Sequence, residues 1–171
     1  VSQYKTHGFI CVAPASLWFT KQFPEERWVE FLQQVPSDIY VYLLGSASDV
    51  QLCERILLQS QHPNILNLAG KLSLLESAAL MRDALMNYVN DSSPMHLCSS
   101  VNAKTTAVYC STVTAYGFGP LSSDAVVVET DEQLACRPCG LHGHQACPEK
   151  HFKCATGIEI GKLLNRLEIR D

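Results

Sequence analysis

The stretch Asn90-Asp-Ser-Ser-Pro-Met-His96 places a carboxylate, two hydroxyls and an imidazole directly after an apolar run. Ser93 is a suitable N-cap, and Pro94 a suitable first helical residue, where its missing N–H is not needed. Such a turn sets free backbone N–H groups and the positive end of a helix dipole beside Asp91 and His96. These groups suit a phosphorylated, hydroxyl-rich ligand. The alternative is an ordinary turn between a strand and a helix, with solvent-exposed polar residues.

Two further turns carry groups of related chemistry. Ser16, Thr20 and Lys21 follow an apolar run, and their hydroxyls and ammonium are donors suited to a diphosphate, unless this is a solvated loop with one surface lysine. The turn Gly45-Ser-Ala-Ser-Asp49 ends in a carboxylate that could cap a helix or accept a ribose hydroxyl. We expect capping to be the role of Asp49.

The elements that position these turns alternate between strand and helix. Repeated strand–helix units imply right-handed crossovers and an α/β fold, a Rossmann-like, doubly wound parallel sheet. Ligands bind beyond the carboxyl ends of the strands in such sheets, so the three turns should share one edge. Apolar runs predict strands at 9–13, 39–44, 64–67, 85–89, 106–110 and 125–128.

Helical spacing of apolar residues predicts which side chains each helix buries. One helix begins at Pro24, one spans about 49–59, one begins at Pro94, and Ser73 with Glu76 forms a capping-box signature for another. A closing helix is expected at about 158–169. The side chains assigned to core faces are Trp28, Phe31, Leu32 and Val35, then Leu74, Ala78 and Met81, and finally Ile160, Leu163, Leu164 and Leu167.

Composition excludes several classes of protein. The 171 residues suit one domain, 1–171, and a net charge of −4 with a pI near 5.8 leaves no basic footprint for nucleic acid. No apolar stretch approaches the roughly 20 residues of a membrane span, and no signal-peptide pattern opens the chain. No G-x-G-x-x-G or P-loop motif follows a strand, which argues against a nicotinamide dehydrogenase or an NTPase.

Several segments together resemble the carboxyl-terminal half of the ADP-heptose:lipopolysaccharide heptosyltransferases, glycosyltransferase family 9. They occur in the family's order and with similar spacing over nearly the whole chain. The matching segments are Ala13-Pro-Ala-Ser16, Thr20-Lys-Gln-Phe-Pro-Glu25, Leu43-Leu-Gly45 with Asp49, Asn67-Leu-Ala-Gly-Lys-Leu-Ser-Leu74, Asn90 to His96, and Cys136-Arg-Pro-Cys139 with Cys147-Pro148 and Cys154.

The resemblance implies the nucleotide-sugar-binding half of a GT-B enzyme that transfers heptose with inversion from ADP-heptose to a lipopolysaccharide core acceptor. The catalytic base and the acceptor site would belong to an amino-terminal domain absent from this chain, so the chain alone should be inactive. No cofactor would be required. The residues implied to bind the donor are Ser16, Thr20, Lys21, Asp49, Leu72, Asp91, Ser92, Ser93, Pro94 and His96.

The chain departs from the family pattern at two glycines, which are Ala15 and Ser93 here. Each adds a side chain where backbone would approach phosphate or adopt unusual torsions. A second hypothesis is therefore a binding module of the same fold that has no transfer activity. The resemblance further implies a lipid-linked glycan acceptor and a cytoplasmic location, with peripheral association at the inner face of the inner membrane.

Eight cysteines fall into two groups. Cys11, Cys53, Cys98 and Cys110 lie in apolar segments as small hydrophobes, a pattern that favours a reducing cytosol. The other four lie in a loop at about 132–156. They could hold a structural zinc, with three histidines as substitute ligands, or simply pack the loop as reduced or oxidisable thiols. A protein centred on this loop is the third hypothesis. The loop's candidate ligands are Cys136, Cys139, Cys147, Cys154, His142, His144 and His151.

Overall fold

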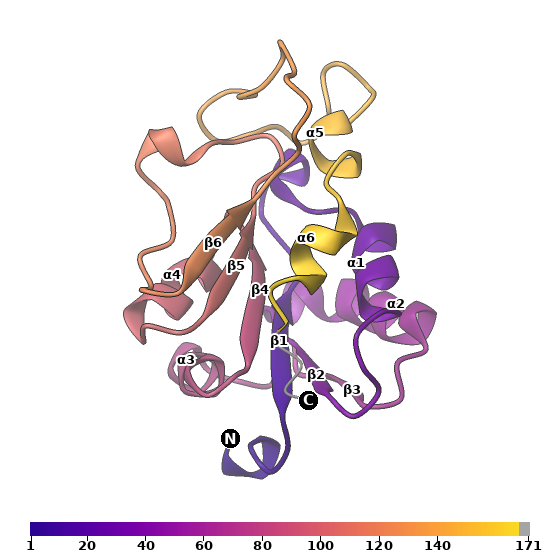
Figure 1. Cartoon of the computed structure of the whole chain (residues 1–171), viewed down its shortest axis with the longest axis vertical. Coiled ribbons are helices and arrows are strands. Elements are labelled where there is room, and N and C mark those ends of the chain that lie inside the picture. The colour runs from indigo at the N-terminus through magenta and orange to yellow at the C-terminus, as the bar shows by residue number, and fades with distance from the viewer. Residues whose placement is uncertain (168–171) are drawn as a thin grey trace.

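Six parallel strands form one sheet at the centre of the fold. We describe residues 1–167 from a computed structural model (Figure 1). The strand order is β3-β2-β1-β4-β5-β6, so the direction of winding reverses between β1 and β4. A ligand crevice is expected at that reversal. The strands are β1 Phe9–Ala13, β2 Tyr40–Leu43, β3 Ile65–Asn67, β4 Met86–Asn90, β5 Thr105–Val108 and β6 Ala125–Val128.

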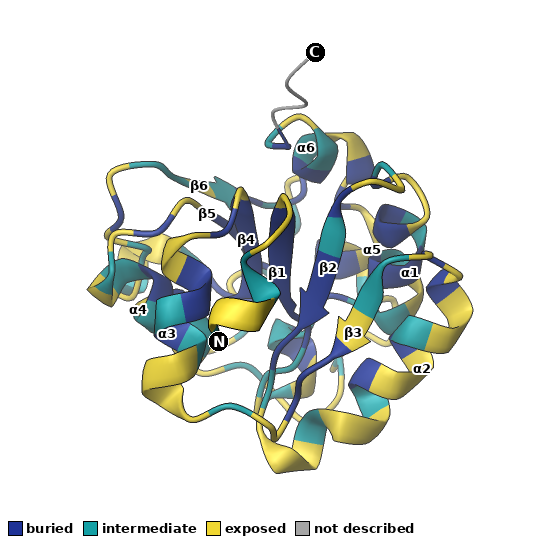
Figure 2. Cartoon of the chain, turned by 90° about the horizontal axis from the view of Figure 1, so that it is seen from below, coloured by how far each residue is buried: buried dark blue, intermediate teal, exposed yellow. Residues whose placement is uncertain are grey.

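Helices cover both faces of the sheet (Figure 2). One face carries α1 Glu25–Leu32, α2 Val50–Ser60, α5 Lys153–Thr156 and α6 Ile160–Leu164, and the other carries α3 Leu74–Arg82 and α4 Ser93–Ser100. Short 3-10 turns complete the pattern. They are η1 Ser2–Tyr4, η2 Phe19–Lys21, η3 Ala47–Asp49 and η4 Thr114–Tyr116.

Side chains of β1 show how the strands divide the core. Ile10 and Val12 belong to the apolar cluster of the α1 face, which includes Trp28. Phe9 and Cys11 point the opposite way, into the cluster of the α3 face. Alternation of this kind buries a parallel strand on both sides, which is why its sequence is a continuous apolar run. The predicted parallel, doubly wound fold is confirmed, and predicted and observed strand ends differ by at most two residues.

Two predictions for the helices were wrong. Leu74 is 69% exposed, although Ala78 and Met81 of the same helix are buried as expected. Leu74 is the first residue of α3 and packs into neither core cluster. Val35 is buried but lies beyond the end of α1.

The closing segment is shorter and more broken than predicted. The single helix expected at about 158–169 is α6 Ile160–Leu164, and positions 168–169 lie outside the described residues. A further short helix, α5, falls inside the expected cysteine loop. No helix within residues 1–167 is long and apolar enough to span a bilayer.

Candidate functional site

Two adjoining cavities open at the carboxyl edge of the sheet. The larger cavity, about 770 Å³, lies between the segments after β1 and β2 and the start of α4. The smaller cavity, about 310 Å³, lies where the segment after β1 meets the residues after β4. Ser16, Ser92 and Ser93 line both cavities. The three turns that were predicted to share one edge therefore meet there.

The cavities contain nine of the ten residues proposed to bind the donor. The larger cavity is lined by Ser16, Asp49, Leu72, Ser92, Ser93 and Pro94. The smaller cavity is lined by Ser16, Lys21, Asp91, Ser92, Ser93 and His96.

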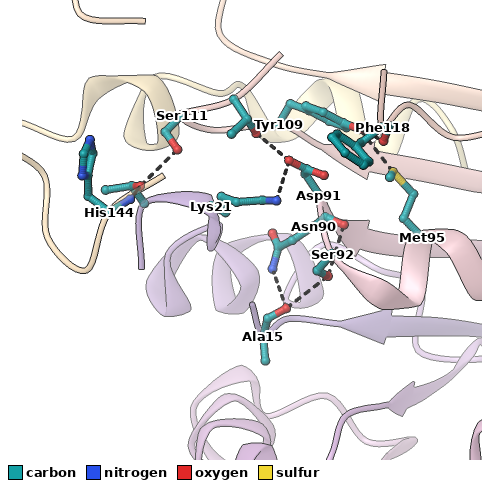
Figure 3. Close-up of polar contacts among 12 residues, drawn as sticks. Ala15, Lys21, Asn90, Asp91, Ser92, Met95, Tyr109, Ser111, Phe118 and His144 are labelled. Carbon is teal, nitrogen blue, oxygen red and sulfur yellow. Dashed lines mark hydrogen bonds and ion pairs between the residues drawn. The ribbon is translucent and has the colours of Figure 1, made fainter. Parts of the chain in front are cut away.

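An ion pair lies at the centre of the smaller cavity. The Lys21 ammonium is 2.8 Å from Oδ2 of Asp91, and the buried Thr112 hydroxyl donates a 2.7 Å hydrogen bond to the same oxygen. Figure 3 shows Lys21 and Asp91 pointing toward each other. Within residues 1–167, Oδ1 of Asp91 accepts no hydrogen bond. That oxygen is therefore available to a hydroxyl of a bound ligand.

Asn90 ties together the two chain segments that form this centre. Its Oδ1 accepts a 3.0 Å hydrogen bond from the Phe23 N–H, and its Nδ2 donates a 2.7 Å hydrogen bond to the Pro14 carbonyl. Figure 3 shows the same amide directed at the neighbouring Ala15 carbonyl, 3.4 Å away. The amide is fully buried at the end of β4. The side chain thus sets the separation between the segment after β1 and the segment after β4.

The amino terminus of α4 borders both cavities. Its N-cap is Ser92, one residue earlier than the predicted Ser93, and Pro94 lies in the first turn. The Ser92 side chain accepts no capping hydrogen bond; its hydroxyl donates toward the Asn90 and Ala15 carbonyls instead. The positive end of the helix dipole borders the site, as an anion requires, although Pro94 has no N–H and the Met95 N–H donates to the Ser92 carbonyl.

The two departures from the family glycines cause no backbone strain. Neither Ala15 nor Ser93 has a positive φ among the described residues. Both side chains line the larger cavity. The added atoms therefore change the shape of the cavity and leave the backbone conformation unstrained.

Asp49 acts as a cap, as expected. Its Oδ2 accepts hydrogen bonds from the Ser46 N–H and hydroxyl, each 2.7 Å long. A Cβ on Gly45 would meet the Asp49 Cβ at 2.8 Å, so this turn requires glycine. One wall of the larger cavity is apolar, because the side chains of Leu17, Leu72 and Leu74 line it. An exposed apolar wall of this kind suits the flat face of a nucleoside base.

Thr20 is the one proposed donor-binding residue outside both cavities. Its side chain is buried, accepts a 2.8 Å hydrogen bond from the His144 N–H, and accepts a 3.1 Å hydrogen bond from the Ser111 hydroxyl (Figure 3). Thr20 therefore connects two loops, and its neighbour Lys21 is the residue placed to contact a ligand.

Thr112 and Asn90 have direct roles at this edge that were not predicted from the sequence. Their position just after, or at the end of, neighbouring parallel strands is the signal that could have identified them.

The cysteine loop is anchored to the same edge. The Arg137 guanidinium donates to the Cys110 and Thr112 carbonyls at 2.7 and 2.9 Å, and the Cys139 N–H donates to the Ser111 carbonyl at 2.7 Å. All eight cysteines are free thiols. These hydrogen bonds hold the base of the loop against the residues that follow β5.

The predicted zinc site has no matching geometry. Among residues 1–167, no three Cys, His, Asp or Glu side chains are arranged to hold a metal ion. Cys136 Sγ and His151 Nε2 lie 3.9 Å apart, and no third group of the described residues is placed to complete a site with them. Burial, followed by the nearby Cys147 thiol, raises the pKa of Cys154 to about 11. Zinc binds the thiolate, so the raised pKa of Cys154 and the arrangement of the groups are both unfavourable to zinc in this conformation.

A third cavity, of about 700 Å³, lies beyond β6 and has a different character. It is lined by acidic side chains, and each of these is already in an ion pair. Glu129 pairs with Arg137, Asp131 with Lys162, and Glu132 with Lys153. The lining holds three carboxylates and one guanidinium, that of Arg137, which already pairs with Glu129. This arrangement does not suit an anionic ligand, so the candidate site remains at β1 and β4.

Solved structures resemble this arrangement over most of the chain. The structure of Escherichia coli ADP-heptose LPS heptosyltransferase II matches with a TM-score of 0.74, 24% identity, and coverage of 94% of this chain and 45% of that one. Escherichia coli heptosyltransferase WaaC with ADP-2-deoxy-2-fluoro heptose matches with a TM-score of 0.66, 17% identity, and coverage of 96% and 47%. The sheet is therefore the Rossmann-like fold of GT-B heptosyltransferase structures.

Sequence comparison agrees with the fold. Lipooligosaccharide heptosyltransferase 2 of Campylobacter jejuni (strain NCTC 11168) is 29% identical over 131 residues, covering 75% of this chain and 39% of the relative. The enzyme of the same name from Haemophilus influenzae is 31% identical over 116 residues, covering 66% and 33%. The chain thus spans about two fifths or less of these relatives. The model of glycosyltransferase family 9 (heptosyltransferase) matches residues 2–150, and the chain belongs to that family.

Proposed function

We propose that this chain is the donor-binding part of a glycosyltransferase that transfers heptose from ADP-heptose to a lipopolysaccharide core acceptor, with inversion. The observation that carries the proposal is the pair of cavities at the sheet reversal. They offer an apolar wall near Leu72, a helix amino terminus, and the Lys21–Asp91 pair. These three features match the base, the diphosphate and the sugar hydroxyls of one extended molecule.

In this proposal each group has one task. Lys21 and the amino terminus of α4 stabilise the negative charge that develops on the departing diphosphate. Oδ1 of Asp91 accepts a sugar hydroxyl, while Oδ2 stays with Lys21 and Thr112. The acceptor hydroxyl attacks the anomeric carbon as the bond to ADP breaks, and its proton passes to a base outside this chain. Asp91 is a binding residue in this scheme and does not act as the base.

The proposal extends to the surroundings of the enzyme. The base and the lipid-linked acceptor site belong to an amino-terminal domain of the full-length protein, so the chain alone has no transferase activity. The reaction takes place in the cytoplasm at the inner face of the inner membrane, where the protein associates peripherally. The support is the family of the chain and its incomplete coverage of the relatives.

Titration calorimetry of the full-length protein with ADP and ADP-heptose tests this assignment. We expect Lys21→Ala and Asp91→Ala each to weaken binding about tenfold or more, because each removes a charge-assisted contact or its buried partner. Lys5→Ala and Asp83→Ala are matched controls, since this second Lys–Asp pair lies at the amino-terminal edge of the sheet. Binding of either ligand that survives the double variant of Lys21 and Asp91 would contradict the site.

A turnover assay separates the proposal from the second hypothesis, a binding module without transferase activity. The larger cavity with its Ala15 and Ser93 side chains is the feature that favours this alternative. A protein that binds ADP-heptose but turns over no heptose donor with any lipopolysaccharide core acceptor would support it. Restored turnover in the double variant of Ala15→Gly and Ser93→Gly would identify those side chains as the cause.

We also propose that the cysteine loop takes up a structural zinc ion in the purified full-length protein. The support is four thiols on one loop. Because zinc binds the thiolate, the ion would also have to overcome the raised pKa of Cys154. The loop would have to close further than it does here. Elemental analysis of protein prepared without chelator should give about one zinc per chain. A stoichiometry near zero would refute the proposal.

A further inference from the structure

The tip of the cysteine loop, residues 141–144, is bonded to the turn that carries Lys21. The Thr20 N–H donates a 3.1 Å hydrogen bond to the His144 carbonyl, and the His144 N–H donates a 2.8 Å hydrogen bond to the Thr20 hydroxyl. One bond joins the two backbones and the other joins the His144 backbone to the Thr20 side chain, so each residue donates to the other. Figure 3 shows His144 beside this turn. Thr20 lies next to Lys21 in the 3-10 turn η2, so the loop tip holds the turn on which the lysine is placed.

Gly143 brings the loop into contact with the lysine itself. A Cβ at this position would lie 2.8 Å from Thr20 Oγ1, 3.2 Å from Lys21 Cγ and 3.3 Å from Ser111 Oγ. The backbone of Gly143 also has a φ of 79°, a conformation that side-chain-bearing residues rarely adopt. Only glycine therefore allows the loop to lie this close to the lysine stem, whose ammonium pairs with Asp91.

The same tip forms part of the smaller cavity. Leu141 and His142 line it together with His96, Lys21 and Asp91. The base of the loop is anchored independently, because Arg137 and Cys139 are bonded to carbonyls after β5. The tip is thus held from two sides, by the turn after β1 and by the end of β5.

We propose that residues 141–144 form the remaining wall of the donor site. In this role Gly143 and Thr20 are positioning residues for the Lys21 ammonium, and His142 is a further hydrogen-bond partner for the diphosphate-sugar end of a nucleotide sugar. The inference rests on the proposed function for the identity of the ligand. The contacts between Gly143, Thr20 and Lys21 do not depend on it.

Gly143→Ala tests the positioning role, with Gly140→Ala as its matched control. Both glycines lie in the same loop with positive φ, 79° and 71°, so both substitutions cause backbone strain. A Cβ on Gly140, however, meets only the His144 ring, at 3.5 Å and beyond. In the full-length protein we expect Gly143→Ala to weaken ADP binding about tenfold or more, because Lys21 is displaced. Gly140→Ala should stay within about twofold.

A second readout requires no ligand. Lys21 is largely shielded, with 17% of its side chain exposed. Its rate of acetylation by acetic anhydride, followed by peptide mass spectrometry, should rise in Gly143→Ala but not in Gly140→Ala. Unchanged Lys21 acetylation in Gly143→Ala would overturn the positioning role. Failure of the wild type to bind ADP would overturn the proposed function, and the acetylation comparison would still decide the role of the loop.

His142→Ala tests the contact with the donor. We expect about fivefold weaker ADP-heptose binding, the loss of one hydrogen bond, with no change in Lys21 acetylation. His7→Ala is the control, because His7 stacks on Tyr40 at the opposite edge of the sheet. Unchanged affinity in His142→Ala would remove His142 from the site. Loss of affinity together with faster acetylation would show that it acts only by holding the loop.

Discussion

Lys21 and Thr112 both contact the same oxygen, Oδ2, of the Asp91 carboxylate. Lys21 contacts it through a charged ammonium, and Thr112 through a buried, neutral hydroxyl. The hydrogen bond fixes Oδ2, and Oδ1 accepts no hydrogen bond within residues 1–167. Thr112→Val keeps the shape of the side chain but removes the donor, so we predict about tenfold weaker ADP-heptose binding, as expected for a lost hydrogen bond to a charged group. Calorimetric titration of the full-length protein measures the change.

Thr112→Ser is the control for this prediction. Serine keeps the hydroxyl, and the backbone carbonyl at this position still accepts from Arg137. Binding should remain within about twofold of wild type. Equal affinities for the valine and serine variants would show that the hydroxyl does not orient the carboxylate.

Two buried asparagines on β4 allow a second comparison. Asn90→Ala leaves the Phe23 N–H and the Pro14 carbonyl without their partner, so we predict a loss of at least about 2 kcal/mol in the free energy of unfolding. ADP binding should also weaken, because the two loops lose their fixed separation. Urea unfolding and calorimetry give the two quantities.

Asn87→Ala separates stability from binding. Asn87 is equally buried, but its amide donates to the Met81 and Lys104 carbonyls at the other end of the strand. The Asn87→Ala substitution should therefore lower the free energy of unfolding without changing the affinity for ADP. Equal loss of affinity in the Asn87 and Asn90 variants would mean that binding merely follows global stability.

At the residue scale, the sequence predicted which side chains meet and missed what several of them do. Lys21 and Asp91 follow parallel strands, so their shared edge could be predicted from chain order alone. The burial of Thr20 could not, because it depends on a loop more than a hundred residues away that returns to cover it. The role of Thr112 was missed for a similar reason, because its hydrogen-bond partner Asp91 follows a different strand.

At the scale of elements, the capping box of α3 permits a quantitative prediction. The Ser73 hydroxyl accepts from the Glu76 N–H and donates to the Glu76 carboxylate. Ser73→Ala should lower the free energy of unfolding by about 1 kcal/mol at neutral pH, the usual effect of a lost N-cap. Ser100→Ala, in an exposed position near the end of α4, should have a negligible effect.

The effect of Ser73→Ala should depend on pH. Hydrogen bonds from the Ser73 backbone and side chain lower the pKa of Glu76 in the folded protein. A lowered pKa stabilises the fold above the pKa of the unfolded state, and this stabilisation is lost as the pH falls through the folded pKa. Urea unfolding of both proteins should therefore give a smaller difference in acid than at neutral pH. A difference that grows on acidification would contradict the capping box.

Prediction of the elements from sequence succeeded where the pattern was local. The capping box is confirmed, and each strand appears near its expected place. Leu74 was misassigned because helical spacing does not reveal whether the first residue of a helix has a neighbour to cover it. The cap of α4 was placed one residue late, since Ser92 and Ser93 are chemically equivalent and only the backbone distinguishes them.

For the whole molecule, the distribution of thiols offers a test of the fold. Cys11, Cys53, Cys98 and Cys110 are buried, and burial raises the pKa of Cys53 to about 12 and of Cys98 to about 11. Few of these thiols are in the reactive thiolate form. We predict that Ellman's reagent at mildly alkaline pH leaves all four unmodified in the native chain, and modifies all eight cysteines in guanidinium.

The loop cysteines serve as the internal control in that experiment. Cys136, Cys139 and Cys147 are partly exposed in the described residues and should react first. Peptide mass spectrometry identifies the modified positions. Rapid modification of Cys11 or Cys110 in the native chain would contradict the arrangement of helices over the sheet.

The adjacency of β1 and β4 has a consequence for the order of assembly. Asn90 bridges to partners 67 and 76 residues earlier in the chain, so the site cannot exist until β4 has docked beside β1. Closing so long a loop costs entropy before any contact repays it. A nucleotide sugar would therefore select fully assembled molecules, and at a hundred times its dissociation constant it would stabilise them by about 2.7 kcal/mol. Donor supply would then govern how long the protein survives in the cell as well as how fast it works.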